Sequence, residues 1–392
     1  MKSRIIIYCS VLLMLSGCIY PFAVEYGDTE FSDIVVSGNI LIGEPTRITL
    51  GYVYPIGTTS GEMRKKYPTG TMTLEHSSGR IWNGSYLSRG MFHFGTEDAP
   101  ASGSYRLHIK PDNGQEYMSD WAGVCQVPEI KNLRASPGNG VVQIVMDLDG
   151  ADSLWNFRWD YSENWEYHAD YRPDLMFVPG LPERDREDPS KIYRLPNEDE
   201  DYYYCWNSDN SVEPGLASAE GQSVNSVKNV VVLNISRADL KISRLYAIDV
   251  TVSGLSSGGR AWQQHLKDIS NDTGSLFSPT PSDMPGNIHC ISDPTLNAVG
   301  YVDAVCRTSQ RLFVGPEYYR RPYDPELLLF YPEADEDGLY NFDNYYYSDS
   351  PVRLSGEKPS KTNVKWGPKR CVDCRAIGGS KNKPEWWPND DK

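Results

Sequence analysis

The sequence predicts a mostly β protein made of immunoglobulin-like and fibronectin-like β-sandwich modules, with one short helix and long loop insertions. Composition gives the first indication, because 33 glycines, 27 prolines and 26 tyrosines are typical of an exported β protein with many turns. The second is that short apolar runs bounded by turn residues recur from residue 33 onward. At 392 residues the chain is too long for one compact core, so we expect two or three domains.

Residues 1–17 are predicted to be a lipoprotein signal peptide. A positively charged start precedes an apolar run that is too short to span a membrane. The run ends in Leu15-Ser16-Gly17-Cys18, which resembles the lipobox of bacterial lipoproteins, whose cysteine carries the lipid. We therefore expect lipidation at Cys18 and a lipidated tether over residues 18–31; the alternative is an ordinary signal peptide that contains a cysteine. No later run of 18 or more apolar residues occurs, so the lipid is the predicted membrane anchor.

Residues 32–127 are predicted to form an N-terminal immunoglobulin-like β-sandwich. Tyr105, Leu107 and Ile109 alternate with polar neighbours, which is the period of a half-buried strand. The "DNG" at 112–114 follows directly and is a hairpin turn signal. A segment of this length, roughly 100 residues, is the size of one such sandwich.

A second β module is predicted over residues 128–370. It opens with "PEIKNLRASPGNGVVQIVMDL", in which "SPGNG" supplies a turn between two strands, and this segment resembles the opening strands of a fibronectin-type module. Residues of about 162–228 include polar and proline-rich stretches without a regular pattern. We expect them to be an insertion in the module, of the kind that carries binding loops or stays disordered.

One convincing helix is predicted, beginning near residue 257. Trp262, Leu266 and Ile269 fall at helical spacing, and either Ser256 or Ser257 can cap the start.

The residues before this helix also match a catalytic motif. Gly254-Leu255-Ser256-Ser257-Gly258 fits G-x-S-x-G between a strand and a helix, as in the nucleophile elbow of a hydrolase. A hydrolase would also need alternating βαβ units, a downstream acid and a late histidine, and His289 is the only histidine after the helix. A serine N-cap is therefore favoured, and a secreted serine hydrolase is the alternative.

Charge and ligand spacing argue against nucleic acid and metal partners. The formal net charge is -15 and the pI is near 4.9. Nucleic acids are bound through patches of Lys and Arg, so this charge argues against a nucleic-acid partner. Acidic clusters at 197–204 and 333–344 lack the ligand spacing of a calcium loop, and the six histidines show no metal-binding spacing. We expect no metal site and no cofactor.

Runs of aromatic residues predict a binding surface. Adjacent rings can form platforms for sugars or for a partner protein, although tyrosine also occupies ordinary strand positions in exported β proteins. The candidate residues are Tyr202, Tyr203, Tyr204, Trp206, Tyr345, Tyr346 and Tyr347.

Six cysteines remain once Cys9 leaves with the signal peptide and Cys18 takes the lipid. An even number in an exported chain predicts up to three disulfides, whose connectivity the spacing leaves open. A local bridge between Cys290 and Cys306 is plausible, because two predicted strands separate them. The disulfide candidates are Cys125, Cys205, Cys290, Cys306, Cys371 and Cys374.

Residues 371–392 are predicted to be a tail that clasps the body. Cys371 and Cys374 form a Cys-x-x-Cys pair, which can be a redox centre, half of a zinc site or a covalent staple. A zinc site needs four ligands, and the chain holds no second Cys-x-x-Cys to complete them. A redox-active pair is typically found at the N-terminus of a helix in a βαβ unit, whereas this pair lies in a polar, glycine-rich tail. A staple is therefore favoured, as a local Cys371–Cys374 ring or as bridges to distant cysteines, with Trp386 and Trp387 burying their rings.

Several ordered signatures together resemble the domain of unknown function 4249 (DUF4249) family. They are the "W-x-Y" strand at 159–161, "YYYCW" at 202–206, "GSLFSPTPSDMPGNIHCISDPTLNAVGYVDAVCRTSQRLFV" at 274–314 and the terminal "CVDCR…GG…KPEWW". The resemblance implies a surface or outer-membrane lipoprotein of Bacteroidota, encoded beside a TonB-dependent outer-membrane receptor. It implies no catalytic residues.

The predicted function is that of an outer-membrane lipoprotein acting as a non-catalytic accessory or ligand-binding partner of a TonB-dependent uptake receptor. The alternatives are the serine hydrolase above and a cell-envelope structural or assembly factor. Localisation is predicted to be lipid-anchored at the outer membrane, with the periplasmic face and the cell surface both open.

Overall fold

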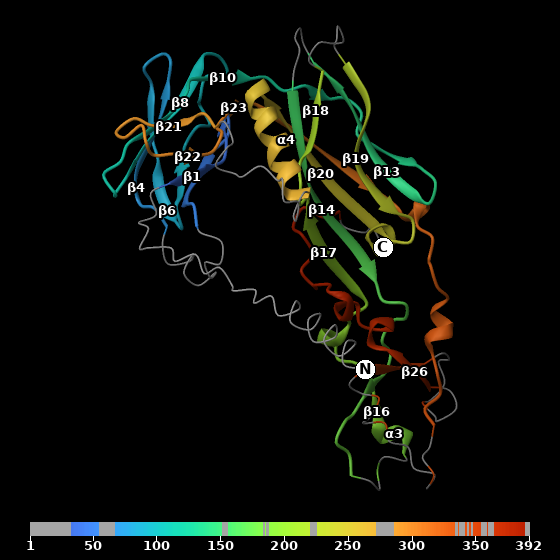
Figure 1. Ribbon diagram of the computed structural model, residues 1–392. Helices are drawn as coiled ribbons and strands as arrows, with labels where there is room; N and C mark the ends of the chain where they lie inside the picture. The colour runs from blue at the N-terminus through green and yellow to red at the C-terminus, as the bar shows by residue number, and fades with distance from the viewer. Residues whose placement is uncertain are drawn as a thin grey trace, which may run out of the picture.

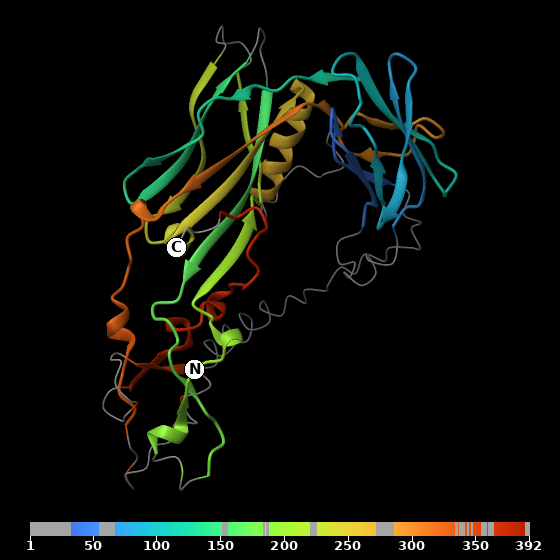
Figure 2. The same ribbon diagram turned by 180° about the vertical axis from the view of Figure 1, so that it is seen from behind.

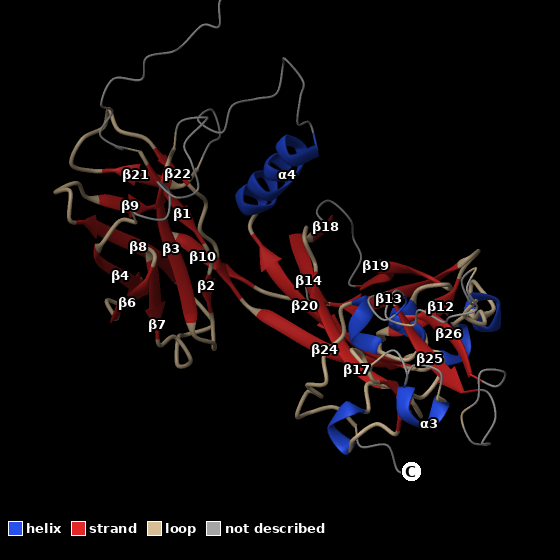
Figure 3. Ribbon diagram, turned by 90° about the horizontal axis from the view of Figure 1, so that it is seen from below, coloured by secondary structure: helices blue, strands red, loops and turns tan. Residues whose placement is uncertain are grey.

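The computed structural model describes residues 33–54, 67–150, 156–182, 188–219, 226–271, 286–333, 348–353 and 364–388, with single residues between them at 185, 336, 342, 345 and 359. Strands dominate the described chain (Figure 3). The predicted mostly β fold class is therefore confirmed. The predicted signal peptide (1–17), the tether (18–31) and Cys18 lie outside the described residues.

The first β-sandwich packs two sheets over one apolar core. On β8, the predicted alternation is confirmed: Tyr105, Leu107 and Ile109 are 0% exposed, and the residues between them are half-buried. The predicted hairpin is confirmed as well, because Gly114 with a φ of +83° turns β8 into β9. The strands of this part are β1 Ile34–Ser37, β2 Ile40–Leu41, β3 Thr46–Tyr52, β4 Gly70–His76, β5 Ile81–Asn83, β6 Ser85–Ser88, β7 Met91–Phe94, β8 Ser104–Pro111, β9 Tyr117–Ser119 and β10 Ala122–Cys125.

A segment from much later in the chain completes this sandwich. Strand β21 Ile288–Cys290 pairs with β9, and β22 Ala298–Val299 pairs with β1. Strand β23 Ala304–Val305 lies between β2 and β10 and pairs with both. In Figure 1 they are the orange strands among the blue and cyan ones. The sheet orders among the described strands are β22-β1-β3-β7-β6 and β2-β23-β10-β8-β4-β5, with β9 between β8 and β21.

The first sandwich is therefore discontinuous, whereas the sequence pattern predicts one continuous segment, 32–127. Ile288, Val302 and Ala304 are at most 3% exposed and belong to the same core as the earlier strands. Asn287 fixes the returning segment, because its side-chain amide donates to the Val302 carbonyl and accepts from the Val302 N–H, both at 2.9 Å. Strands of two or three residues carry too little periodic pattern to be assigned to a distant sheet.

The second β-sandwich packs a sheet of order β11-β13-β12, with β19 beside β13, against a sheet of order β17-β14-β20-β24, with β18 beside β14. The predicted "SPGNG" turn is confirmed, because it joins β12 to β13. The strands are β11 Glu129–Ile130, β12 Arg134–Pro137, β13 Val141–Asp149, β14 Asn156–His168, β17 Tyr204–Asn210, β18 Gly215–Ser218, β19 Ser226–Ser236, β20 Leu245–Leu255 and β24 Arg307–Val314.

The predicted insertion at about 162–228 is shorter in the structure. The end of β14, β17, β18 and the start of β19 all fall within that range and belong to the sandwich. β17 ends its sheet and leaves Ser208, Asp209 and Asn210 exposed, so its sequence is as polar as that of a loop. The excursion away from the sandwich runs from 169 to 203.

That excursion forms a small lower lobe with a later part of the chain (Figure 1). Two two-stranded sheets, β15–β16 and β25–β26, pack around Trp366, which is 0% exposed. The lobe contains β15 Met176–Phe177, α3 Pro189–Ile192, β16 Tyr193–Arg194, the short helix η2 Glu198–Glu200, β25 Asp349–Arg353 and β26 Val364–Pro368.

The predicted helix is confirmed as α4 Ser257–Asn271, which lies beside β14, β18 and β20 on the side facing the first sandwich (Figures 1 and 2). None of the helices in the described part of the chain is long and apolar enough to cross a membrane. The remaining short helices are η3 Leu240–Ile242, η5 Pro316–Tyr318, η6 Pro325–Leu328, η7 Lys369–Cys371 and η8 Cys374–Ile377.

Candidate functional site

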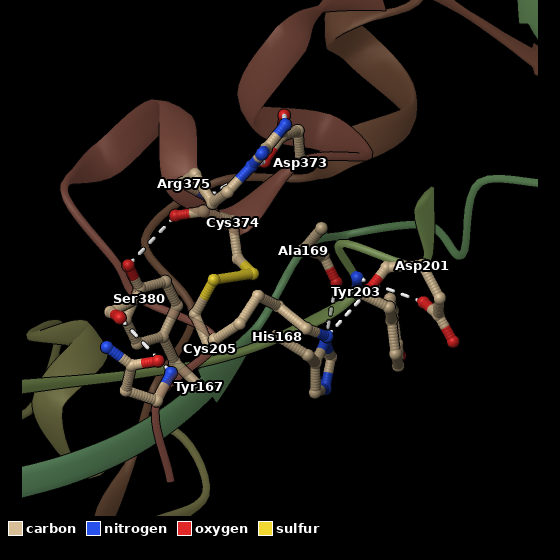
Figure 4. Close-up of a disulfide and its surroundings, with 12 residues drawn as sticks. Tyr167, His168, Ala169, Asp201, Tyr203, Cys205, Asp373, Cys374, Arg375 and Ser380 are labelled. Atoms are coloured by element: carbon tan, nitrogen blue, oxygen red, sulfur yellow. Dashed lines mark hydrogen bonds and ion pairs between the residues drawn. A yellow bond between two sulfur atoms is a disulfide. The ribbon is translucent and has the colours of Figure 1, made fainter. Parts of the chain in front are cut away.

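A disulfide fixes the C-terminal tail, residues 371–388, to the second sandwich. Cys374 at the start of η8 is bonded to Cys205 on β17 (Figure 4). The Cys374 N–H donates to the Tyr202 carbonyl at 3.0 Å, and the Tyr167 hydroxyl donates to the Cys374 carbonyl at 2.9 Å. Cys374 is thus held by Tyr167 on β14 and by Tyr202, two residues before β17.

The tail then continues along the edge of that sheet. Trp206 and Ser380 exchange two backbone hydrogen bonds of 2.8 Å, which extends the sheet beyond β17. Trp387 is 3% exposed and donates its indole N–H to Glu166 at 3.2 Å, as a buried Trp must find an acceptor. Trp386 remains 39% exposed under the Arg311 guanidinium, so only one of the two predicted anchors is buried.

A cavity of about 250 Å³ lies where the sandwich, the lower lobe and the tail meet; we call it the basal cavity. Its walls come from the end of β14, from η3, from the segment after β24 and from the tail, so four separate parts of the chain close it. The lining residues are His168, Asp170, Leu240, Ser243, Tyr319, Arg321, Tyr323, Arg370 and Ile377.

Asp170 is the polar centre of the basal cavity. Its side chain is only 8% exposed and pairs with the Arg321 guanidinium at 2.6 Å. The Tyr323 hydroxyl donates to the same carboxylate at 3.2 Å, and burial followed by the nearby Asp170 charge raises the pKa of Tyr323 to about 12. Arg370 lies with its guanidinium carbon 5.4 Å from the centre of the Tyr323 ring.

His168 forms another wall and is held as a neutral donor. Its Nδ1–H donates to the Ala169 carbonyl, and its ring stacks on Tyr203 with 4.7 Å between centres (Figure 4). Burial lowers the pKa of His168; the Ala169 carbonyl opposes this, whereas the charges of Arg244 and Arg321 add to it. The ring is therefore neutral at pH 7, which leaves Nε2 as a hydrogen-bond acceptor.

The predicted tyrosine surface is largely covered by the protein's own side chains. Arg375 lies 3.2 Å from the centre of the Tyr202 ring, Tyr203 stacks on His168, and Arg244 lies 5.1 Å from the Tyr204 ring centre. Trp206 is half-buried beneath the tail.

The later tyrosine run is described only in part. Tyr345 packs against Trp366 and Phe330 in the lower lobe, and Tyr346 and Tyr347 lie outside the described residues. Among the described residues of the predicted surface, Tyr202 lines a hollow of about 290 Å³ on the lower lobe.

The disulfide candidates divide into one bridge and four free thiols. Cys205–Cys374 is the bridge, so the local Cys371–Cys374 ring is not formed. The predicted Cys290–Cys306 bridge is wrong, because both thiols are free: Cys290 lies on β21, whereas Cys306 lies between β23 and β24. Cys125 and Cys371 are free as well, and burial, with Asp170 next, raises the pKa of Cys371 to about 11.

Ser256 is the N-cap of α4. Its hydroxyl accepts the Gly259 N–H at 2.9 Å and lies 3.3 Å from the Tyr301 hydroxyl. The Ser256 N–H donates to Asp303 at 3.1 Å, and burial raises the pKa of that carboxyl.

Packing explains both glycines of the G-x-S-x-G match. A Cβ on Gly254 would lie 2.2 Å from the Gln126 carbonyl oxygen, and one on Gly258 would lie 2.1 Å from the Tyr301 hydroxyl. The first sandwich thus approaches the backbone of Gly254 and Gly258 too closely for a side chain at either position. Packing therefore accounts for the two glycines of the motif.

Metal ligands do not gather in the described residues, where no group of three His, Cys, Asp or Glu side chains is placed to hold an ion. Of the two acidic clusters, 197–204 joins the lower lobe to β17, with Glu200 paired to Arg194 at 2.6 Å. Most of 333–344 lies outside the described residues.

A family model describes much of this architecture. The domain of unknown function (DUF4249) model matches residues 19–311. The chain belongs to the DUF4249 family. The match includes Cys205 and the whole first sandwich, but it ends before Arg321, Arg370 and Cys374, so much of the basal cavity and the DUF4249-like end motif lie beyond it.

Two solved structures show distant similarity. One is a DUF4785 family protein from Legionella pneumophila, with 8% identity, a TM-score of 0.15, and coverage of 56% of this chain and 51% of that one. The other is a putative carbohydrate binding protein from Bacteroides uniformis, with 11% identity, a TM-score of 0.13, and coverage of 59% and 93%. This chain thus spans about half of the first structure. No curated protein matches the DUF4249 chain.

Sequence reasoning missed the residues of the basal cavity. Asp170, Arg321 and Arg370 are spread over 200 positions and form no motif, so spacing gives no reason to group them. The one local signal is "RRPYD" at 320–324, a cationic and aromatic segment after the last strand of the sandwich.

Proposed function

We propose that this DUF4249 protein is an outer-membrane lipoprotein that acts as a non-catalytic, ligand-binding partner of a TonB-dependent uptake receptor. The observation that carries the binding role is the basal cavity, which a covalently held tail closes on one side. Rings, a carboxylate and guanidinium groups converge there, as is typical of small-molecule sites. The receptor partnership and the Bacteroidota origin rest on what the family resemblance implies.

The lipid anchor is proposed from Leu15-Ser16-Gly17-Cys18. Acyl chains on Cys18 would hold the sandwiches close to a receptor barrel without a membrane-spanning helix. Either the periplasmic face or the cell surface suits this role, and protease accessibility on intact cells distinguishes the two.

Affinity purification from detergent-solubilised membranes tests the partnership. We expect the tagged full-length chain to recover a TonB-dependent receptor. The matched control is Cys18→Ser, which removes the lipid acceptor and should reduce recovery. Recovery of the tagged chain without any receptor would overturn the partnership and favour a structural or assembly role.

The serine hydrolase is the weaker candidate, because the described partners of the Ser256 side chain are the Gly259 amide, the Tyr301 hydroxyl and the Asp303 carboxyl, and none of these is a histidine base. A serine-reactive fluorophosphonate discriminates between the two classes. Labelling of the wild-type protein that is lost in Ser256→Ala would contradict the non-catalytic proposal.

A further inference from the structure

The basal cavity offers donors and acceptors from opposite sides. Asp170 and the neutral His168 Nε2 accept hydrogen bonds, whereas Arg321, Tyr323 and Arg370 donate them. A ligand hydroxyl both donates and accepts, so a hydroxylated ligand can use both sets at once. A bare anion such as sulfate would meet the Asp170 carboxylate.

The charges of the cavity do not cancel. Asp170 is neutralised by Arg321, with which it pairs at 2.6 Å. Arg370 has no carboxylate partner among the described residues, and its guanidinium lies over the Tyr323 ring. One positive charge is thus left for a ligand, in a chain whose overall net charge is -15. Because the chain as a whole repels anions, this local positive charge is what would attract an anionic group to the cavity.

Size and shape limit the ligand further. A volume of about 250 Å³ suits one small ring or chain rather than a polymer. Tyr319 and Tyr323 supply ring faces, and Leu240 and Ile377 supply apolar walls, so the C–H faces of a compact ligand can be covered.

We propose that the basal cavity binds a small hydroxylated carboxylate, of the chemical class of sugar acids. Arg370 pairs with the carboxylate of the ligand, and Asp170, Arg321 and Tyr323 form hydrogen bonds with the hydroxyl groups of the ligand. This inference rests on the ligand-binding part of the proposed function.

Titration of the full-length protein with glucuronate and with glucose tests the inference, because the two sugars differ by one carboxylate. We expect glucuronate to bind at least about tenfold more tightly, as one charge-assisted pair contributes roughly that factor. Added salt should weaken glucuronate binding and leave glucose binding unchanged.

Two variants assign the effect to named side chains. Arg370→Gln should lower glucuronate affinity to that of glucose, and Tyr323→Phe should weaken both sugars. Arg311→Gln is the matched control: it removes an arginine on β24 that pairs with Asp249 outside the cavity, and binding should not change. Thermal unfolding of each variant shows whether the fold is kept.

Three results would overturn the inference: equal affinity for the two sugars, glucuronate binding that Arg370→Gln leaves intact, or no binding of either sugar by the folded protein. None of these depends on the receptor purification. Loss of the receptor partner with glucuronate binding retained would overturn the proposed partnership alone.

Discussion

Gly379 lies where the tail crosses Tyr167 and Cys205. A Cβ at this position would lie 2.2 Å from the Tyr167 hydroxyl oxygen and 2.6 Å from the Cys205 Cβ, so close approach requires a glycine at 379. Gly378 serves a different purpose, because it ends η8 with a φ of +89°.

Gly379→Ala should therefore destabilise the protein by about 1–3 kcal/mol, the usual cost of overpacking a close contact. The measurement is the free energy of unfolding in denaturant. Gly123→Ala is the matched control, because a Cβ there meets nothing within 4 Å. Equal effects of the two substitutions would contradict the packing argument.

His168 makes stability depend on pH. Burial lowers its pKa below the ordinary histidine value of about 6.5, so the unfolded chain takes up a proton at higher pH than the folded one. The free energy of unfolding should then decrease as the pH falls through 6.5 towards the lower pKa of the folded state, and level off below it.

Unfolding in denaturant at pH 7, 6 and 5 checks this expectation. His168→Asn keeps an N–H for the Ala169 carbonyl but does not titrate, so it should lose less stability between pH 7 and 5 than the wild type does. His93→Asn, in the first sandwich, is the matched control for replacing a histidine elsewhere in the chain. A parallel pH dependence of His168→Asn and the wild type would argue against the assignment.

At the scale of single elements, the tail depends on its disulfide. The bridge joins residues 169 positions apart, so it removes much conformational freedom from the unfolded chain. Loss of such a native bridge costs about 2–5 kcal/mol.

Cys374→Ser should lower stability by that amount and expose the tail to trypsin at Lys381 and Lys383. The rate of tail cleavage on a gel is the measurement. Cys371→Ser is the control, because it changes a buried free thiol three residues away and keeps the bridge. A tail that is cleaved equally slowly in both variants would show that hydrogen bonds alone hold it.

Local elements were predictable from the sequence where one face of an element is buried. The β8 alternation and the Ser256 cap each arise from neighbouring residues, and both appear in the structure. β17 could not be recognised, because an edge strand with one solvated end has the composition of a loop. The Cys205–Cys374 pairing could not be chosen either, since spacing does not fix which cysteines meet in space.

At the scale of the whole molecule, the chain crosses between the two sandwiches and back. It passes from β10 to β11, returns after α4 to supply β21–β23, and crosses again from β23 to β24. Asp303 joins the parts at this junction: its carbonyl accepts from Ile40 of the first sandwich, and its carboxylate accepts the N–H of Ser256. No property of residues 32–127 alone reveals that the sandwich needs a later segment.

The first sandwich should therefore not fold from residues 33–127 alone. Without 286–306, strands β1, β2, β9 and β10 lose their pairing with the returning segment, and the core loses Ile288, Val302 and Ala304. Burial of Ile288 and of Val302 contributes about 1.5–3 kcal/mol each, and with the lost strand pairing this approaches the about 5–15 kcal/mol stability of a whole domain. Residues 33–127 joined by a glycine-serine linker to 286–306 should unfold cooperatively on heating, whereas 33–127 should show no such transition. A cooperative transition of residues 33–127 alone would contradict this expectation, because it would show that the sandwich folds without strands β21–β23.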